Sequence, residues 1–173
     1  MKKLLVVVII LVGVSVLSYA LLGGFKSLEV QVQTNPETLI LGIAYSGKIN
    51  SDSLQNLFME ARDIVENSPE ASAIAIAYYG EANEETGMVN NFIGVELSAN
   101  KTDLTHKDWK IRRFNAQNSV TGCISANILV MPTPEDMLTE LRTFSKEQQL
   151  QSDTVFIEYY KGPNDLCVEL LAK

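Results

Sequence analysis

The chain has 173 residues, of which 46% are hydrophobic and 20% charged, so it can form a packed domain and is neither disordered nor fibrous. Its net charge is −7, which argues against a protein that grips nucleic-acid phosphates through clustered basic side chains. Two cysteines are too few for a disulfide framework or a four-thiolate zinc site. We therefore expect no nucleic-acid partner, no metal and no other cofactor.

The N-terminus combines a basic pair with a long apolar run. Lys2 and Lys3 precede residues 4–22, which carry no charge and as a helix would extend roughly 28 Å, close to the about 30 Å of a membrane core. We predict a transmembrane anchor in residues 1–25, with the remaining chain outside the cytoplasm because basic residues stay inside. Cleavage near Ala20 is the alternative, and it would give a secreted or periplasmic protein.

The remaining residues, 26–173, repeat their own pattern. A shift of about 80 residues lays the segment 28–99 over the segment 108–173, with Gly42 over Gly122. The same kinds of element then follow in the same order. We predict one domain built from two copies of one unit, and chance similarity of two ordinary segments is the alternative.

The first half is predicted to contain a helix among short strands. Apolar residues between Leu54 and Val65 recur at helical spacing and form one stripe. Strands are expected at 39–45, 73–79 and 92–97, with one more at 28–33 before the unit.

The second half follows the same order. Thr133 and Pro134 are typical of a helix start, and the strands are expected at 109–114, 119–129, 155–160 and 166–171. The predicted fold class is α+β. It consists of duplicated strand-helix-strand-strand units in two antiparallel sheets, each covered by a helix, after one transmembrane helix.

Side-chain alternation suggests which residues line a cleft between the halves. Phe156, Glu158 and Tyr160 share one face of a strand, and superposing Ala77 on Glu158 adds Ala77 and Tyr79 to that face. We expect the face that carries the isoleucines to pack under the helices, which leaves this one to the cleft. Small side chains opposite aromatic rings suit a pocket, although a tight core uses the same contrast.

The order of the elements, the run 156–160 with its Gly-Pro-Asn-Asp turn and the closing Cys-Val-Glu-Leu resemble a known family. This is the DNA gyrase inhibitor-like (GyrI-like) small-molecule-binding domain, which also serves as the effector-binding domain of AraC-type and MerR-type regulators. The resemblance implies that Glu158 lies on the floor of an aromatic cleft and meets cationic or amphiphilic ligands, with Tyr160 beside it. No helix-turn-helix precedes the domain, and the polar turn at 81–87 is longer than the family pattern.

A carboxylate among aromatic rings needs either a proton or a cationic partner. We expect Glu158 to bind a hydrophobic or cationic small molecule, with Tyr45 and Trp109 as further wall residues. The alternative is that Glu158 pairs with Arg112 or Arg113, or points into solvent, in which case the cleft selects by shape alone.

Cys123 and Cys167 both fall on predicted strands of the second half. They are either bridged, as an oxidising compartment would allow, or buried as free thiols.

The predicted function is that of a membrane-tethered domain that senses or sequesters a small molecule and is not an enzyme. Two alternatives remain. In the first, Glu158 and Tyr160 serve a hydrolase of electrophilic compounds as general base and hydrogen-bond donor. In the second, the open sheet faces dock a protein partner, whose identity the sequence does not reveal.

Overall fold

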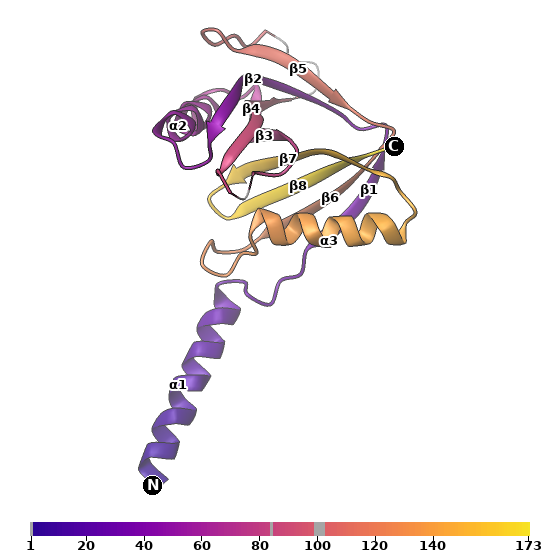
Figure 1. The fold of residues 1–173 in the computed structure, drawn as a ribbon. Helices are drawn as coiled ribbons and strands as arrows, with labels where there is room; N and C mark the ends of the chain where they lie inside the picture. Colours follow the sequence, from indigo (N-terminus) through magenta and orange to yellow (C-terminus); the bar gives the residue numbers. More distant parts are fainter. Residues whose placement is uncertain (1, 84, 99–102) are drawn as a thin grey trace.

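The computed structural model describes residues 2–83, 85–98 and 103–173, with side chains from Val7 onwards. Within these residues the chain forms three helices and eight strands (Figure 1). Their order is α1 (Lys2–Leu21), β1 (Glu29–Thr34), β2 (Glu37–Lys48), α2 (Asp52–Asn67), β3 (Ala71–Tyr79), β4 (Met88–Leu97), β5 (Lys110–Asn115), β6 (Asn118–Ser125), α3 (Pro134–Glu147), β7 (Ser152–Gly162) and β8 (Asp165–Ala172).

All eight strands belong to one antiparallel sheet, in the order β1-β6-β8-β7-β3-β4-β2-β5. The α+β class is confirmed, but the prediction of two separate sheets is wrong. The two halves join because β3 pairs with β7, from Ile74 opposite Tyr160 to Tyr79 opposite Val155. Without this pairing, β3 and β7 would each be an edge strand with a row of unpaired backbone N–H and C=O groups in the middle of the molecule.

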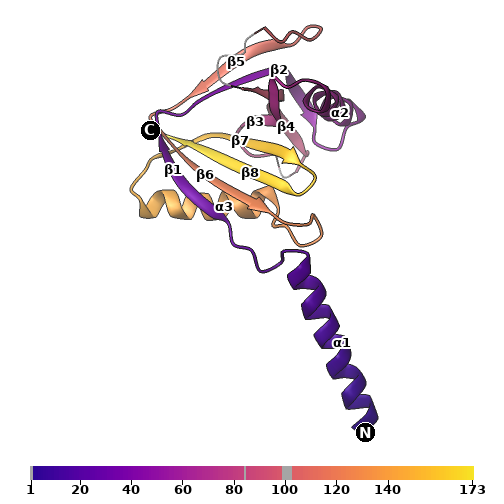
Figure 2. The same ribbon diagram turned by 180° about the vertical axis from the view of Figure 1, so that it is seen from behind.

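The outer strands are exchanged between the halves. Strand β1 pairs with β6 of the second half, and β5 pairs with β2 of the first half. The turn between β1 and β2 meets the turn between β5 and β6, where the backbone N–H of Asn35 donates to the carbonyl of Gln117 at 2.8 Å. Asn35 has a φ of 51°, a left-handed conformation that asparagine tolerates well. The strands therefore converge at this end of the sheet, near the C-terminus (Figure 2).

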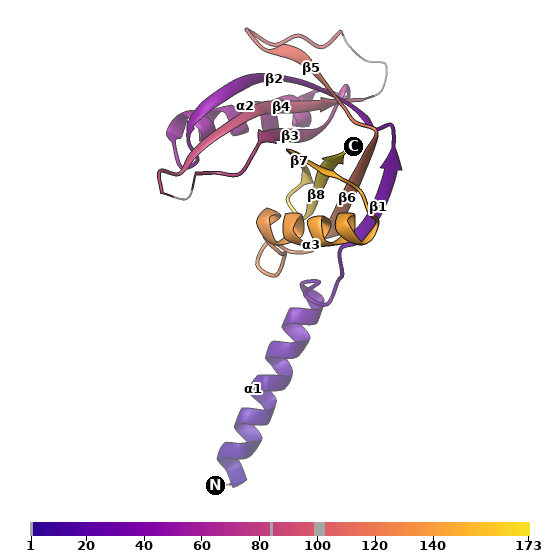
Figure 3. The same cartoon turned by 45° about the vertical axis from the view of Figure 1, so that its right-hand side comes forward.

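Helices α2 and α3 cover the same face of the sheet. Helix α2 packs Leu54, Ala61 and Ile64 toward β2–β4, and α3 packs Met137, Leu138 and Leu141 toward β6–β8 (Figure 3). Residues that lie directly opposite each other on β3 and β7 point to the same face of the sheet. The pairs Ile74–Tyr160 and Tyr78–Phe156 connect the apolar cluster under α2 with the one under α3. We call this side the helix face and the opposite side the helix-free face.

Helix α1 projects away from the sheet (Figure 3). In the described part of the chain, no helix is both long and apolar enough to cross a membrane. The predicted transmembrane anchor is therefore not supported, and the localisation that rested on it is wrong.

The two cysteines form a disulfide. Cys123 of β6 lies directly opposite Cys167 of β8 in the ladder, and their sulfur atoms are bonded. The choice that the sequence left open is thereby decided in favour of the bridge, because strand register brings together two residues that are 44 positions apart.

Replacing both cysteines by alanine should lower the free energy of unfolding. A closed loop of 44 residues removes enough entropy from the unfolded chain to be worth about 4 kcal/mol, and measured bridges typically contribute about 2–4 kcal/mol. Urea unfolding of the wild type in reducing buffer is the control, and it should match the double variant. Equal stability of the oxidised and reduced wild type would contradict this assignment.

Candidate functional site

Glu158 lies at the centre of the helix face, on the strand where the two halves join. The residue is 6% exposed, although its side chain carries a carboxyl group. The Tyr160 hydroxyl donates a hydrogen bond to Oε2 of Glu158 at 2.8 Å, and the Tyr78 hydroxyl donates to the same oxygen at 3.4 Å. Two tyrosines, one from each half, therefore hold one buried acid.

Aromatic and aliphatic side chains surround this acid. Phe58 of α2 meets the Tyr160 ring edge-on with centroids 5.5 Å apart, and Tyr78 stacks on Phe156 at 4.8 Å. Tyr160 packs against the apolar clusters under both helices. Phe58, Tyr78 and Tyr160 are only partly buried, so the rings around Glu158 are in part exposed to solvent. We call Glu158, Tyr78, Tyr160, Phe58 and Phe156 the acid site.

Burial raises the pKa of Glu158 from 4.5 to about 7, and the hydrogen bonds from Tyr160 and Tyr78 offset only part of this rise. Burial, together with the neighbouring Glu158 charge, also raises the pKa of both tyrosines far above their usual value. The tyrosines therefore remain hydrogen-bond donors at every physiological pH, and Glu158 is the group that changes charge.

The described residues supply no cationic partner for Glu158. Arg113 pairs with Glu37 at 2.8 Å, and the Arg112 guanidinium lies 4.6 Å from the centre of the Phe92 ring. Both arginines are on β5, at the far edge of the sheet from β7. The alternative in which one of them neutralises Glu158 is therefore wrong.

The predicted site residues fall on two faces of the sheet. Phe156, Glu158 and Tyr160 lie together, but on the helix face and not on the face turned away from the helices. Ala77 and Tyr79 lie on the helix-free face, Tyr79 beside Phe114. The prediction failed because it superposed Ala77 on Glu158. In the sheet Glu158 lies opposite Ile76, so the superposition was wrong by one residue. An error of one residue assigns every side chain of a strand to the opposite face of the sheet.

The other two predicted wall residues have structural contacts. The Tyr45 hydroxyl bonds to Ser51, the N-cap of α2, at 2.5 Å, and its ring packs in the cluster that also contacts Tyr78 and Tyr160. Trp109 is buried under α2 and meets the His106 ring edge-on at 5.0 Å. Tyr45 therefore fixes the start of the helix beside the acid site, and Trp109 belongs to the core.

Sequence reasoning missed two residues of the acid site. With Ala77 and Tyr79 on the face of Glu158, alternation puts Tyr78 on the opposite face, and Phe58 falls within the predicted helical stripe from Leu54 to Val65. Superposing β3 on β7 with an offset of an even number of residues would have found Tyr78. An even offset keeps residues of the same face of the sheet aligned with one another. The sequence carries no comparable signal for Phe58, since its contact depends on where α2 sits on the sheet.

Comparison with known proteins supports the fold. No family model and no curated protein matches this sequence. The structure is similar to an uncharacterized conserved protein from Listeria innocua (TM-score 0.58, 11% identity, 84% of this chain and 92% of that one). It is also similar to the C-terminal domain of EcmrR (0.57, 10%, 86% and 99%) and to a hydrolase from Listeria innocua (0.54, 12%, 84% and 92%).

At these identities the likeness establishes the fold alone. The match to the EcmrR C-terminal domain shows that this chain shares the fold of that domain.

Stability should depend on pH through Glu158. A carboxyl group whose pKa is higher in the folded state stabilises the fold when protonated, and this contribution is lost as the pH rises from about 4.5 through about 7. The shift corresponds to about 3 kcal/mol. We expect the free energy of unfolding of the wild type to fall by about this amount between pH 4.5 and 8, relative to Glu158→Gln. Parallel urea-derived profiles for the two proteins would contradict the buried acid.

Proposed function

We propose that this protein binds a hydrophobic or amphiphilic organic cation at the acid site, with Glu158 as the counter-charge. The observation that carries the proposal is a glutamate residue, 6% exposed, whose carboxyl group is held by two tyrosines with no cation beside it among the described residues. The GyrI-like fold agrees with such a role.

The preference for a cation follows from the cost of burying charge. An isolated carboxylate in apolar surroundings is unfavourable, so Glu158 either takes up a proton or acquires a positive partner. A lipophilic cation supplies the charge at little desolvation cost of its own. The rings of Phe58, Tyr78 and Tyr160 add cation–π attraction of about 0.5–2 kcal/mol each.

Binding should strengthen with pH. Above a pH of about 7 the Glu158 carboxyl is ionised, whereas below it a cation has to displace a proton. The affinity for a cation should therefore fall by about tenfold for each pH unit below 7. The affinity for a neutral ligand of the same shape should move in the opposite direction or stay constant.

Methyltriphenylphosphonium and neutral triphenylphosphine oxide form a matched pair of probes for the full chain. At pH 8 we expect the cation to bind at least tenfold more tightly than the oxide. Glu158→Gln should remove this preference and leave the affinity for the oxide within about twofold. Titration calorimetry measures all four affinities.

The control variant is Glu169→Gln, which changes another buried acid on the helix-free face and should leave the phosphonium affinity unchanged. An equal loss for both probes in Glu158→Gln, or no saturable binding to the wild type, would contradict the proposal.

Hydrolysis of an electrophilic small molecule is the second candidate. It is favoured by the pKa of about 7, which suits a general base near neutral pH, and by two tyrosine hydroxyls beside the acid. The hydrolase from Listeria innocua has a similar fold. In this scheme Glu158 would take a proton from water as the water oxygen bonds to carbon and the C–O bond of the substrate breaks. A tyrosine would donate a hydrogen bond to the departing oxygen, which would then receive the proton from Glu158.

Product formation separates the two candidates. With styrene oxide as substrate, the binding proposal predicts no diol above the uncatalysed background in either the wild type or Glu158→Gln. Diol that forms repeatedly per protein molecule in the wild type and disappears in Glu158→Gln would favour the hydrolase.

A further inference from the structure

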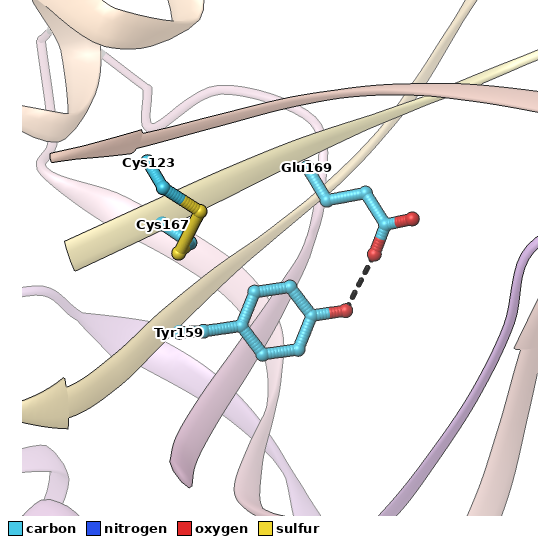
Figure 4. Close-up of a disulfide and its surroundings, with 4 residues drawn as sticks. All are labelled: Cys123, Tyr159, Cys167 and Glu169. Carbon is cyan, nitrogen blue, oxygen red and sulfur yellow. Dashed lines mark hydrogen bonds between the residues drawn. A yellow bond between two sulfur atoms is a disulfide. The ribbon is translucent and has the colours of Figure 1, made fainter. Parts of the chain in front are cut away.

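The helix-free face contains a second buried acid. Glu169 of β8 is 5% exposed, and the hydroxyl of Tyr159 donates a hydrogen bond to its Oε2 at 2.5 Å (Figure 4). Thr38 of β2 contacts the same hydroxyl, with oxygen atoms 3.1 Å apart. The disulfide between Cys123 and Cys167 lies beside this pair (Figure 4).

A cleft of about 250 Å³ opens onto Glu169 and Tyr159. Its walls come from six strands, at the end of the sheet where the strands converge near the C-terminus (Figure 2). Gln31, Thr38, Glu96 and Thr121 contribute polar side chains to the lining. The volume would hold roughly eight water molecules at about 30 Å³ each, which is enough for a small organic molecule and too little for a large aromatic cation.

The lining carries an excess of negative charge. It contains Glu37, Glu96 and Glu169 against Lys161. Glu37 is compensated by its ion pair with Arg113, and Glu96 receives a hydrogen bond from Ser72 at 2.5 Å, which leaves its charge in place. The cleft therefore attracts cations toward its buried end.

The buried end also has unused acceptors. Burial and the Glu169 charge raise the pKa of Tyr159 well above its ordinary value, so Tyr159 acts there as a donor. A carboxylate offers about four acceptor positions on its two oxygens. Within the described residues Tyr159 is the one donor to Glu169, which leaves most of these positions for a ligand in the cleft.

We propose that this cleft is a second binding site, independent of the acid site, for a small polar amine whose ammonium group bonds to Glu169. An ammonium group brings three donors and one positive charge, which match the carboxylate and the neighbouring hydroxyl and amide oxygens of Thr121 and Gln31. A metal ion is a poorer fit, because the described residues contain no group of three or more ligating side chains in suitable positions.

Putrescine is the probe, with 1-butanol as a neutral molecule of similar length. Calorimetry on the full chain at pH 8 and low salt should show saturable binding of one putrescine and none of 1-butanol. Glu169→Gln should weaken putrescine at least tenfold, and Glu158→Gln should leave it within twofold. Glu158→Gln should thus affect only the phosphonium, and Glu169→Gln only putrescine. The two variants therefore test the two sites separately, and either proposal can be contradicted while the other stands.

Two further variants test the cleft even if Glu169→Gln does not fold. Glu96→Gln removes a half-buried charge from the wall and should weaken putrescine about threefold. Thr121→Leu adds bulk to the cleft and should abolish binding while leaving the phosphonium affinity unchanged. No saturable binding, or equal affinity in the wild type and folded Glu169→Gln, would overturn the proposal and leave Tyr159 and Glu169 as an internal hydrogen bond only.

Discussion

The antiparallel pairing of β3 with β7 is the constraint on which the rest of the structure depends. It turns two small units into one continuous sheet and places Glu158 opposite Ile76 where they join. The same register sets Tyr78 beside Phe156 and close enough to bond to the acid. Since α2 belongs to one unit and α3 to the other, this pairing also fixes where the two helices stand on either side of the carboxyl group.

Three consecutive residues of β7 serve both faces of the sheet. Glu158 and Tyr160 point to the helix face, whereas Tyr159 points to the helix-free face and bonds to Glu169. Each face therefore has a buried acid held by tyrosine, with different surroundings: rings and aliphatic side chains around Glu158, and polar side chains around Glu169. This contrast in surroundings is why we assign ligands of different chemistry to the two acids.

Local signals in the sequence predicted the elements well. The stripe from Leu54 to Val65 lies within α2, and Thr133 caps α3 with Pro134 in its first turn. Helical spacing and capping depend on residues that are close in the sequence, so they can be recognised without knowledge of the fold. Glu158 could also be singled out as a candidate, because a lone acid in an apolar strand is unusual in any context.

What the sequence did not give depends on contacts between distant residues. The continuous sheet, the disulfide and the face on which Glu158 lies all follow from register between strands, and the predicted superposition of β3 on β7 was wrong by one residue. The apolar N-terminal run illustrates a different limit, because its composition alone led to a span that the structure does not support.

The exchange of β1 and β5 has a consequence for the unity of the chain. Each unit completes its sheet with a strand that belongs, by sequence position, to the other. Cutting the polypeptide between β4 and β5 would leave two fragments that remain interlocked, and neither would possess a whole set of strands if made separately. The chain from β1 to β8 therefore forms one sheet that cannot be divided into two independent units.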